Sequence, residues 1–187
     1  SVGPPPVNIS ALNPYNCRVA GEVCDGVALH PITSAKYLAE VIKPNILKGA
    51  QKTGRSSGDI SLSGGGFVVT GPGQQTIDAK KESVRRRIAF YFSTRTYFPV
   101  LESHGFTEIG QRLHEMSLKG EWAEMAELVS DEMLDVFCVR GEFDEIADRF
   151  LERYGDLLDE VSFSPRTQEP IEEAQLRKII RRFHETG

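Results

Sequence analysis

The sequence has few cysteines, no long hydrophobic run and no excess of basic residues. Three cysteines in 187 residues are too few and too scattered for a disulfide framework, and we expect all three to be reduced thiols in the core. No apolar run approaches the roughly 20 residues that span a bilayer, and no signal-peptide pattern is present, so the cytoplasm is the default expectation. The net charge of −5 argues against nucleic acid as the main partner.

A recognisable set of catalytic or metal-binding residues is also lacking. The chain has no nucleophile elbow, no zinc-type histidine pair, no paired carboxylate set and no kinase-type signature. His104 and His114 lie ten residues apart, which is not a ligand spacing, so we interpret both as surface or hydrogen-bonded histidines. The residues therefore predict no metal site and name no catalytic side chain.

The segment from Val7 to Ser34 predicts two short buried strands joined by a helix. Residues 7–12 and 26–30 are apolar runs that end at Asn13-Pro14 and at Pro31. Between them, small and β-branched residues recur at helical spacing. A strand, a helix and a second strand in this order form a βαβ unit, from which parallel sheets are built.

Ligands of such sheets bind beyond the carboxyl ends of the strands. The candidate binding residues are therefore Ala11, Leu12 and Asn13 after the first strand, and His30 and Thr33 after the second. Backbone N–H groups and hydroxyls in these loops can hold a phosphate. Asn13 is compatible with a left-handed conformation that turns an amide toward an anion and, equally, with an ordinary Asn-Pro turn. A lone histidine such as His30 is more often structural than a cofactor contact.

The middle of the chain predicts a helix, a third strand and a second long helix. The first helix covers residues 34–52, and Pro44 must end or kink it. In the third strand, residues 59–70, Gly64-Gly65-Gly66 indicates a bulge or a close approach, and a bend that makes room for a side chain is favoured over a ligand contact. On the second helix, about residues 75–92, we interpret Arg85-Arg86-Arg87 as a solvated face, with an acidic ligand tail as the less favoured alternative.

The remainder predicts a helical segment, one more strand and a terminal helix. Residues 95–135 carry no strand signal, and Arg140-Gly141 leads into a helix with Glu142, Asp144 and Glu145 in its first turn. Residues 160–163 predict the fourth strand. We expect a single domain over residues 1–187, with a linker-like start at 1–6, a helical insertion at 95–135 and a C-terminal helix at 170–187.

Several segments together carry a family resemblance. In order they are VNISALNP, RVAGEVCDGVALHPITS, SAKYLAEVIKP, GGFVVTG, FCVRGEFDEIADRFLERYG and DEVSF. Over about residues 4–165 the chain resembles the C-terminal half of the luciferase-like monooxygenase family, and within it most closely the branch of probable coenzyme F-420-dependent oxidoreductases.

The resemblance implies an α/β fold, the C-terminal half of a TIM-type (β/α)8 barrel with about four parallel strands, surrounding helices and a helical insertion before the last strand. It implies coenzyme F-420 or FMN as cofactor, with the phosphate held by the loops at residues 11–14 and 30–33. The family commonly has glycine where this chain has Asn13. The proton-transfer residues would lie in the N-terminal half, which this chain lacks.

Two functional hypotheses follow. The first is part of a flavin- or deazaflavin-dependent oxidoreductase or monooxygenase that acts on a small-molecule substrate, which no residue identifies. The second is a non-catalytic half-barrel that acts as an oligomerising scaffold or subunit. In either case two strand edges would be unpaired. Water would also reach the side chains that face the barrel interior, which are Ile9, Ala11, Val27 and Leu29 or their alternates. We therefore expect a homo-oligomer, most simply a dimer, or association with the missing half.

Overall fold

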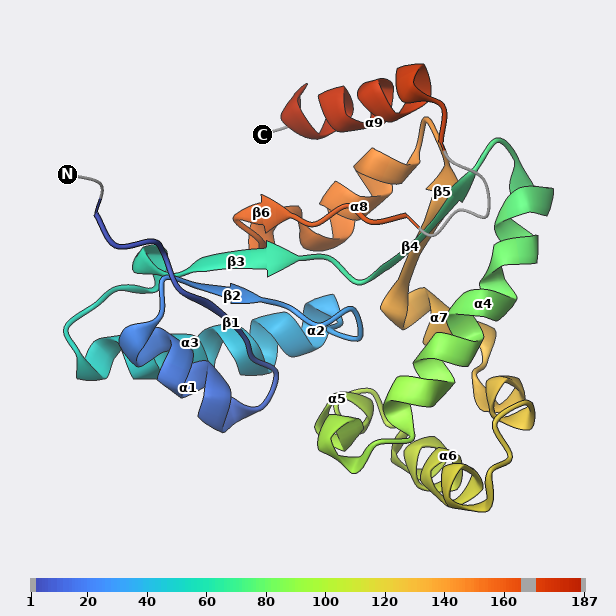
Figure 1. The fold of residues 1–187 in the computed structure, drawn as a ribbon, viewed down its shortest axis with the longest axis horizontal. Coiled ribbons are helices and arrows are strands. Elements are labelled where there is room, and N and C mark those ends of the chain that lie inside the picture. Colours follow the sequence, from blue (N-terminus) through green and yellow to red (C-terminus); the bar gives the residue numbers. More distant parts are fainter. Residues whose placement is uncertain (1–2, 166–170, 186–187) are drawn as a thin grey trace.

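The structure, a computed structural model, describes residues 3–165 and 171–185. Within them, four strands form a parallel sheet in the order β1-β2-β3-β6, and β4 and β5 form a separate parallel pair (Figure 1). The four-stranded sheet confirms the predicted parallel strands, each shorter than expected. The strands are β1 (Asn8–Ser10), β2 (Gly26–Ala28), β3 (Ser61–Gly64), β4 (Phe67–Gly71), β5 (Cys138–Glu142) and β6 (Glu160–Val161).

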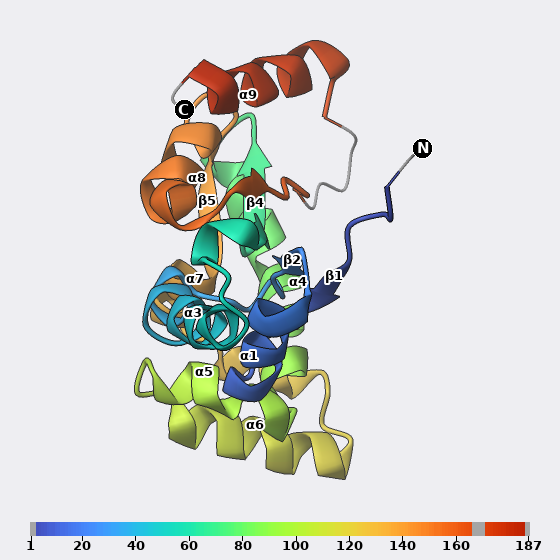
Figure 2. The ribbon, with the colours of Figure 1, turned by 90° about the vertical axis from the view of Figure 1, so that its left-hand side faces the viewer.

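Helices α1 and α3 pack on each other against one side of the four-stranded sheet, whereas α4 to α7 form a separate group beside it (Figures 1 and 2). Short 3-10 turns occur at 57–59, 95–97, 124–128 and 155–157. The α-helices are α1 (Pro14–Val23), α2 (Ala35–Tyr37), α3 (Lys43–Lys52), α4 (Gln74–Phe92), α5 (Phe98–Glu102), α6 (Thr107–Lys119), α7 (Asp131–Phe137), α8 (Ile146–Tyr154) and α9 (Glu173–Glu185).

The two faces of the four-stranded sheet differ in polarity. Ile9, Val27 and Leu62 are aligned across β1, β2 and β3, and the last two are buried. Side chains alternate along a strand, so Ser10 and Ala28, which pair with each other, point to the other face, and both are exposed. The face exposed to water therefore carries Ser10 and Ala28, the alternate set, and not Ile9 and Val27. Because these side chains are small or polar, their exposure costs little free energy.

The predicted helix over residues 34–52 is present, and its response to Pro44 is a widened turn. Residues 38–42 form a π-helical turn, in which the N–H of Lys43 donates to the carbonyl of Leu38, five residues back. The proline follows at the second position of α3, and Lys43 before it keeps helical angles, φ −55° and ψ −46°. The helix thus continues past the proline without ending.

The third predicted strand is wrong as a continuous element. It breaks at Gly65 (φ 142°) and Gly66 (φ 71°), and the chain passes from β3 into β4, which belongs to the other sheet. A Cβ atom on Gly65 would lie 1.9 Å from Cζ of Phe150, and one on Gly66 would lie 2.8 Å from the hydroxyl of Tyr154. The favoured interpretation, a bend that makes room for a neighbouring side chain, is confirmed.

Residues 95–135 are helical, as predicted, but the next segment contains an unpredicted strand. Cys138–Glu142 forms β5, which pairs with β4, so Glu142 lies in a strand and α8 starts only at Ile146. The acidic residue in the first turn of α8 is therefore Asp148, and not the predicted Glu142, Asp144 and Glu145. The short apolar run at 136–139 gave too little signal to separate a strand from a helix end.

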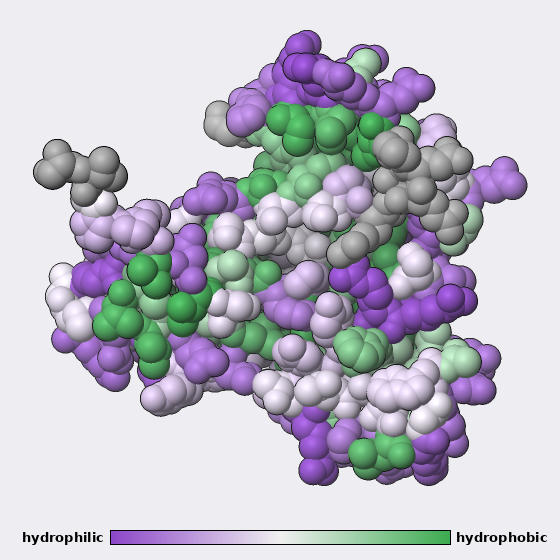
Figure 3. Space-filling model, viewed as in Figure 1, coloured by the Kyte–Doolittle hydropathy of each residue, from purple (hydrophilic) through white to green (hydrophobic). Residues whose placement is uncertain are grey.

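The C-terminal part packs α9 on α8. Phe150 and Tyr154 of α8 are fully buried, and Phe183 of α9 makes an edge-on ring contact with Phe150. Figure 3 shows a hydrophobic surface beneath α9 and a hydrophilic surface on its outer side. All three cysteines are buried free thiols, as predicted. In the described part of the chain, no helix combines the length and the apolarity needed to cross a bilayer.

Candidate functional site

The structure brings the two predicted binding loops to one edge of the sheet. Ser10, the last residue of β1, pairs with Ala28, the last residue of β2, in a parallel ladder. Residues 11–14 and 30–33 therefore leave the sheet close together, at its carboxyl edge. We call these two segments the strand-end loops.

In the first strand-end loop, Ala11 and Leu12 are buried. They can offer a ligand only their backbone groups. Asn13 has φ −78° and ψ 149°, so the left-handed conformation is wrong and the ordinary Asn-Pro turn is present. The following proline explains this, since it disfavours helical angles in the residue before it. The Asn13 side chain makes no capping bond to α1, which leaves the N–H groups of the first turn without that partner.

Thr33 is the most informative residue of the second strand-end loop. Its N–H donates to the His30 carbonyl at 2.8 Å, and its carbonyl accepts from the Tyr154 hydroxyl at 3.1 Å. The residue is 2% exposed, yet its hydroxyl has no hydrogen-bond partner among the described residues. A buried unsatisfied hydroxyl costs about 1 to 3 kcal/mol, so a polar ligand that reached it would recover this cost.

The neighbouring Ser34 connects this loop to the helical segment. Its hydroxyl accepts from the N–H of Tyr37, which caps α2, and lies 2.7 Å from Nε2 of His104. Burial and, secondarily, Lys36 lower the pKa of His104, which favours the neutral imidazole to which a serine hydroxyl can donate. His114 likewise contacts the carbonyl of Ser93. Both histidines are hydrogen-bonded, as predicted.

His30 is held in a group of aromatic side chains. Its ring stacks on Tyr97 with 5.2 Å between centroids and meets the edge of Tyr91 at 4.5 Å. The N–H of Ile32 donates to Nδ1, which places the proton of the neutral ring on Nε2. Burial, followed by the nearby Arg87, lowers the pKa of His30, so the ring is kept neutral.

Arg87 is a cation of this site and belongs to Arg85-Arg86-Arg87, for which the sequence favours a solvated face over an acidic ligand tail. Its guanidinium lies 5.0 Å from the centre of the Phe67 ring and acts electrostatically on His30. It is half-buried, whereas Arg86 is exposed and Arg85 pairs with Asp131, so the three arginines do not share one solvated face. No ion pair of Arg87 is found within residues 3–165 and 171–185. No local sequence pattern indicates its contact with Phe67.

The strand-end loops can hold an oxyanion. They combine backbone N–H groups, one unsatisfied hydroxyl and a nearby cation, which are groups that bind phosphate. The described part of the chain has no candidate metal site, because no three His, Cys, Asp or Glu side chains lie close enough together to act as ligands. The fold is of the parallel α/β class, in which small molecules commonly bind at loops beyond the strand ends.

Comparisons with known proteins identify the family. The sequence model of the luciferase-like monooxygenases matches residues 1–160, and the chain belongs to this family. A protein of Mycobacterium tuberculosis described as uncharacterized is 38% identical over 157 residues, which are 84% of this chain and 46% of that protein. The 5,10-methylenetetrahydromethanopterin reductase of Archaeoglobus fulgidus is 30% identical over 155 residues, 79% of this chain and 44% of that enzyme.

The fold has a solved counterpart. The coenzyme F-420-dependent tetrahydromethanopterin reductase of Methanopyrus kandleri superposes with a TM-score of 0.71 at 24% identity, over 94% of this chain and 48% of that one. This likeness confirms the fold predicted from the resemblance. The chain spans about half the length of the relatives it matches.

Proposed function

We propose that this chain is the C-terminal half-barrel of a coenzyme F-420-dependent oxidoreductase, and that its strand-end loops bind the phosphate of the cofactor. The family supports an oxidoreductase, and the reductases among the relatives favour coenzyme F-420 over FMN. Monooxygenase activity with FMN is the alternative within the same family. The observation that carries the proposal is the buried, unsatisfied hydroxyl of Thr33 at the carboxyl end of the sheet.

The residues of the site fit a phosphate group unequally. Thr33 offers a hydroxyl, the first turn of α1 offers N–H groups, and Arg87 offers a positive charge near His30. Asn13 fits less well, because its Cβ restricts the backbone approach that glycine at this position in the family would allow. The other candidates, Ala11, Leu12 and His30, would contribute backbone groups and the wall of the site.

The cofactor, when bound, supplies the hydride chemistry. The chain would bind the phosphate, orient the cofactor and exclude water along the ring cluster of His30, Tyr91 and Tyr97. A neutral His30 avoids placing a second cation beside Arg87. The substrate is a small molecule, and a cytoplasmic location fits such chemistry.

The half-barrel also needs a partner. β1 and β6 stand at the two edges of the sheet, and their residues are mostly exposed. Unpaired strand edges are templates for pairing with another chain. We propose that they pair with an N-terminal half-barrel or with a second copy. If this association occurs without cofactor binding, the chain is the oligomerising scaffold of the second hypothesis.

The proposal is tested by replacing the unsatisfied hydroxyl. Thr33→Val removes it at almost constant volume, and Thr70→Val is a matched control, since Thr70 is also buried and without a partner but lies on β4. A hydrogen bond to a charged group contributes about 1.5 to 3 kcal/mol, so Thr33→Val should weaken coenzyme F-420 binding by about 10-fold or more. Thr70→Val should leave the affinity unchanged.

Titration of the protein with coenzyme F-420 and with FMN, followed by absorbance, measures both effects. In the absence of cofactor, Thr33→Val should not lower the free energy of unfolding, because it deletes an unsatisfied polar group. Equal affinities of the wild type and Thr33→Val would refute the assignment of Thr33. Tighter binding of FMN than of coenzyme F-420 would favour the alternative.

A further inference from the structure

A recess lined by arginines lies between β5 and α8. Its volume is about 370 Å³, and Val139, Arg140, Arg149, Glu152 and Arg153 line it. A neighbouring recess of about 390 Å³ shares the three arginines and reaches Lys81 on α4. We call Arg140, Arg149 and Arg153 the arginine cluster.

The arginine cluster is separate from the strand-end loops. Lys81 of the neighbouring recess and Tyr91, which contacts His30, are both on α4. They are ten residues apart, which corresponds to about 15 Å along a helix axis. No strand-end loop residue lines either recess.

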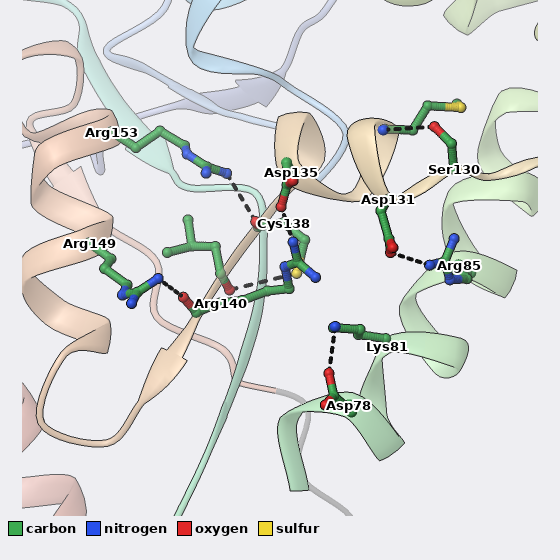
Figure 4. A network of polar contacts seen from close by, with 12 residues as sticks. Asp78, Lys81, Arg85, Ser130, Asp131, Asp135, Cys138, Arg140, Arg149 and Arg153 are labelled. Atoms are coloured by element: carbon green, nitrogen blue, oxygen red, sulfur yellow. Dashed lines mark hydrogen bonds and ion pairs between the residues drawn. The ribbon is translucent and has the colours of Figure 1, made fainter. Parts of the chain in front are cut away.

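Two of the arginines are held by the free edge of β5. Arg149 donates to the carbonyl of Arg140 at 3.2 Å, and Arg153 donates to the carbonyl of Cys138 at 3.0 Å. Figure 4 shows both side chains reaching from α8 to β5. Since β5 pairs only with β4 among the described strands, these bonds satisfy carbonyls that no strand covers. The geometry is built by the fold and needs no ligand to form.

The charges of the cluster are incompletely balanced. Arg140 pairs with Asp135, and Arg149 with Glu145 at 3.0 Å, but no carboxylate partner of Arg153 is found in the described part of the chain. The recess is lined by three guanidinium groups and one carboxylate. Burial lowers the pKa of Arg140. The carboxylates of Asp131 and Asp78 oppose this shift, whereas the positive charges of Arg153 and Arg85 add to it. Each guanidinium has five N–H donors, so the bonds to the β5 carbonyls leave most of them available.

We propose that the arginine cluster binds the oxyanion group of a small molecule, a phosphate or a carboxylate. Guanidinium forks match both groups with two parallel hydrogen bonds, and an anion would balance the charge of Arg153. The volume of the recess is in the range of small-molecule sites. This site is additional to the cofactor site proposed above and does not depend on it.

Calorimetric titration of the 187-residue chain at constant ionic strength tests the proposal, with inorganic phosphate in one arm and succinate in the other. The variant is Arg153→Gln. Arg177→Gln is the matched control, because Arg177 is an exposed arginine on α9 that pairs with Glu173. Arg149→Gln serves as a second variant if Arg153→Gln does not fold, since Arg149 is half exposed.

Saturable binding of one of the two anions is expected, weakened about 10-fold or more by Arg153→Gln and unchanged by Arg177→Gln. The tighter arm identifies the group as phosphate or carboxylate. Phosphate binding that is lost in Thr33→Val and retained in Arg153→Gln would place the anion at the strand-end loops and overturn this proposal while supporting the other. An absence of saturable binding in both arms would overturn it as well.

Discussion

Gly65→Ala should destabilise the protein through two separable causes. The first is the backbone, since φ is 142° at this position, a conformation that costs an L residue at least about 1 to 2 kcal/mol. The second is the clash of the new Cβ, 1.9 Å from Cζ and 2.4 Å from Cε2 of the buried Phe150. Overpacking of this kind costs about 1 to 3 kcal/mol, so the expected loss in the free energy of unfolding is about 2 to 5 kcal/mol.

Urea denaturation followed by circular dichroism measures this loss, and two further proteins separate its causes. Gly105→Ala has a positive φ of 76° but no atom within 4 Å of the new Cβ, so it should show only the smaller backbone cost. In Gly65→Ala/Phe150→Leu the ring is gone, and the combined loss should be about 1 to 3 kcal/mol smaller than the sum of the two single losses. Additive losses, or a Gly65→Ala no worse than Gly105→Ala, would refute the close approach of Phe150 as the cause of the strand break.

Three other predictions concern pH, the strand-end loop and association. Burial lowers the pKa values of His30 and His104 from 6.5, so the unfolded chain binds more protons than the folded one just below that pH. The free energy of unfolding should therefore fall on acidification below pH 6.5. His30→Gln should make this dependence on pH less steep. Ser34→Ala removes the bonds to Tyr37 and His104 and should cost about 1 to 2 kcal/mol, whereas Ser83→Ala on the exposed face of α4 should cost under about 0.5, by urea denaturation. Light scattering should show an oligomer at micromolar concentration, because β1 and β6 have unpaired edges; a stable monomer would show that these edges are covered.

The βαβ unit at the start of the chain could be predicted because its local signals are strong. Short apolar runs that end at Asn13-Pro14 and at Pro31 indicate two strands with a helix between them. These patterns depend on neighbours in sequence, and tertiary packing did not override them.

Features that depend on distant residues could not be predicted. The break at Gly65 is set by Phe150, 85 positions later, although three consecutive glycines did mark the place. β5 is a strand because it pairs with β4, about 70 residues earlier in the chain. The short apolar run at 136–139 does not indicate which segment it pairs with. In the candidate site, Thr33 was predicted by its position after a strand, whereas Arg87, Tyr91 and Tyr97 reach His30 from elements that no local pattern connects to it.

The central claim is that the strand-end loops bind the phosphate of a deazaflavin cofactor. A crystal structure of the chain soaked with coenzyme F-420 tests it most directly. We expect the phosphate within hydrogen-bonding distance of the Thr33 hydroxyl, which has no other partner among the described residues. A phosphate bound at the arginine cluster, or anywhere else away from residues 11–14 and 30–33, would contradict the claim.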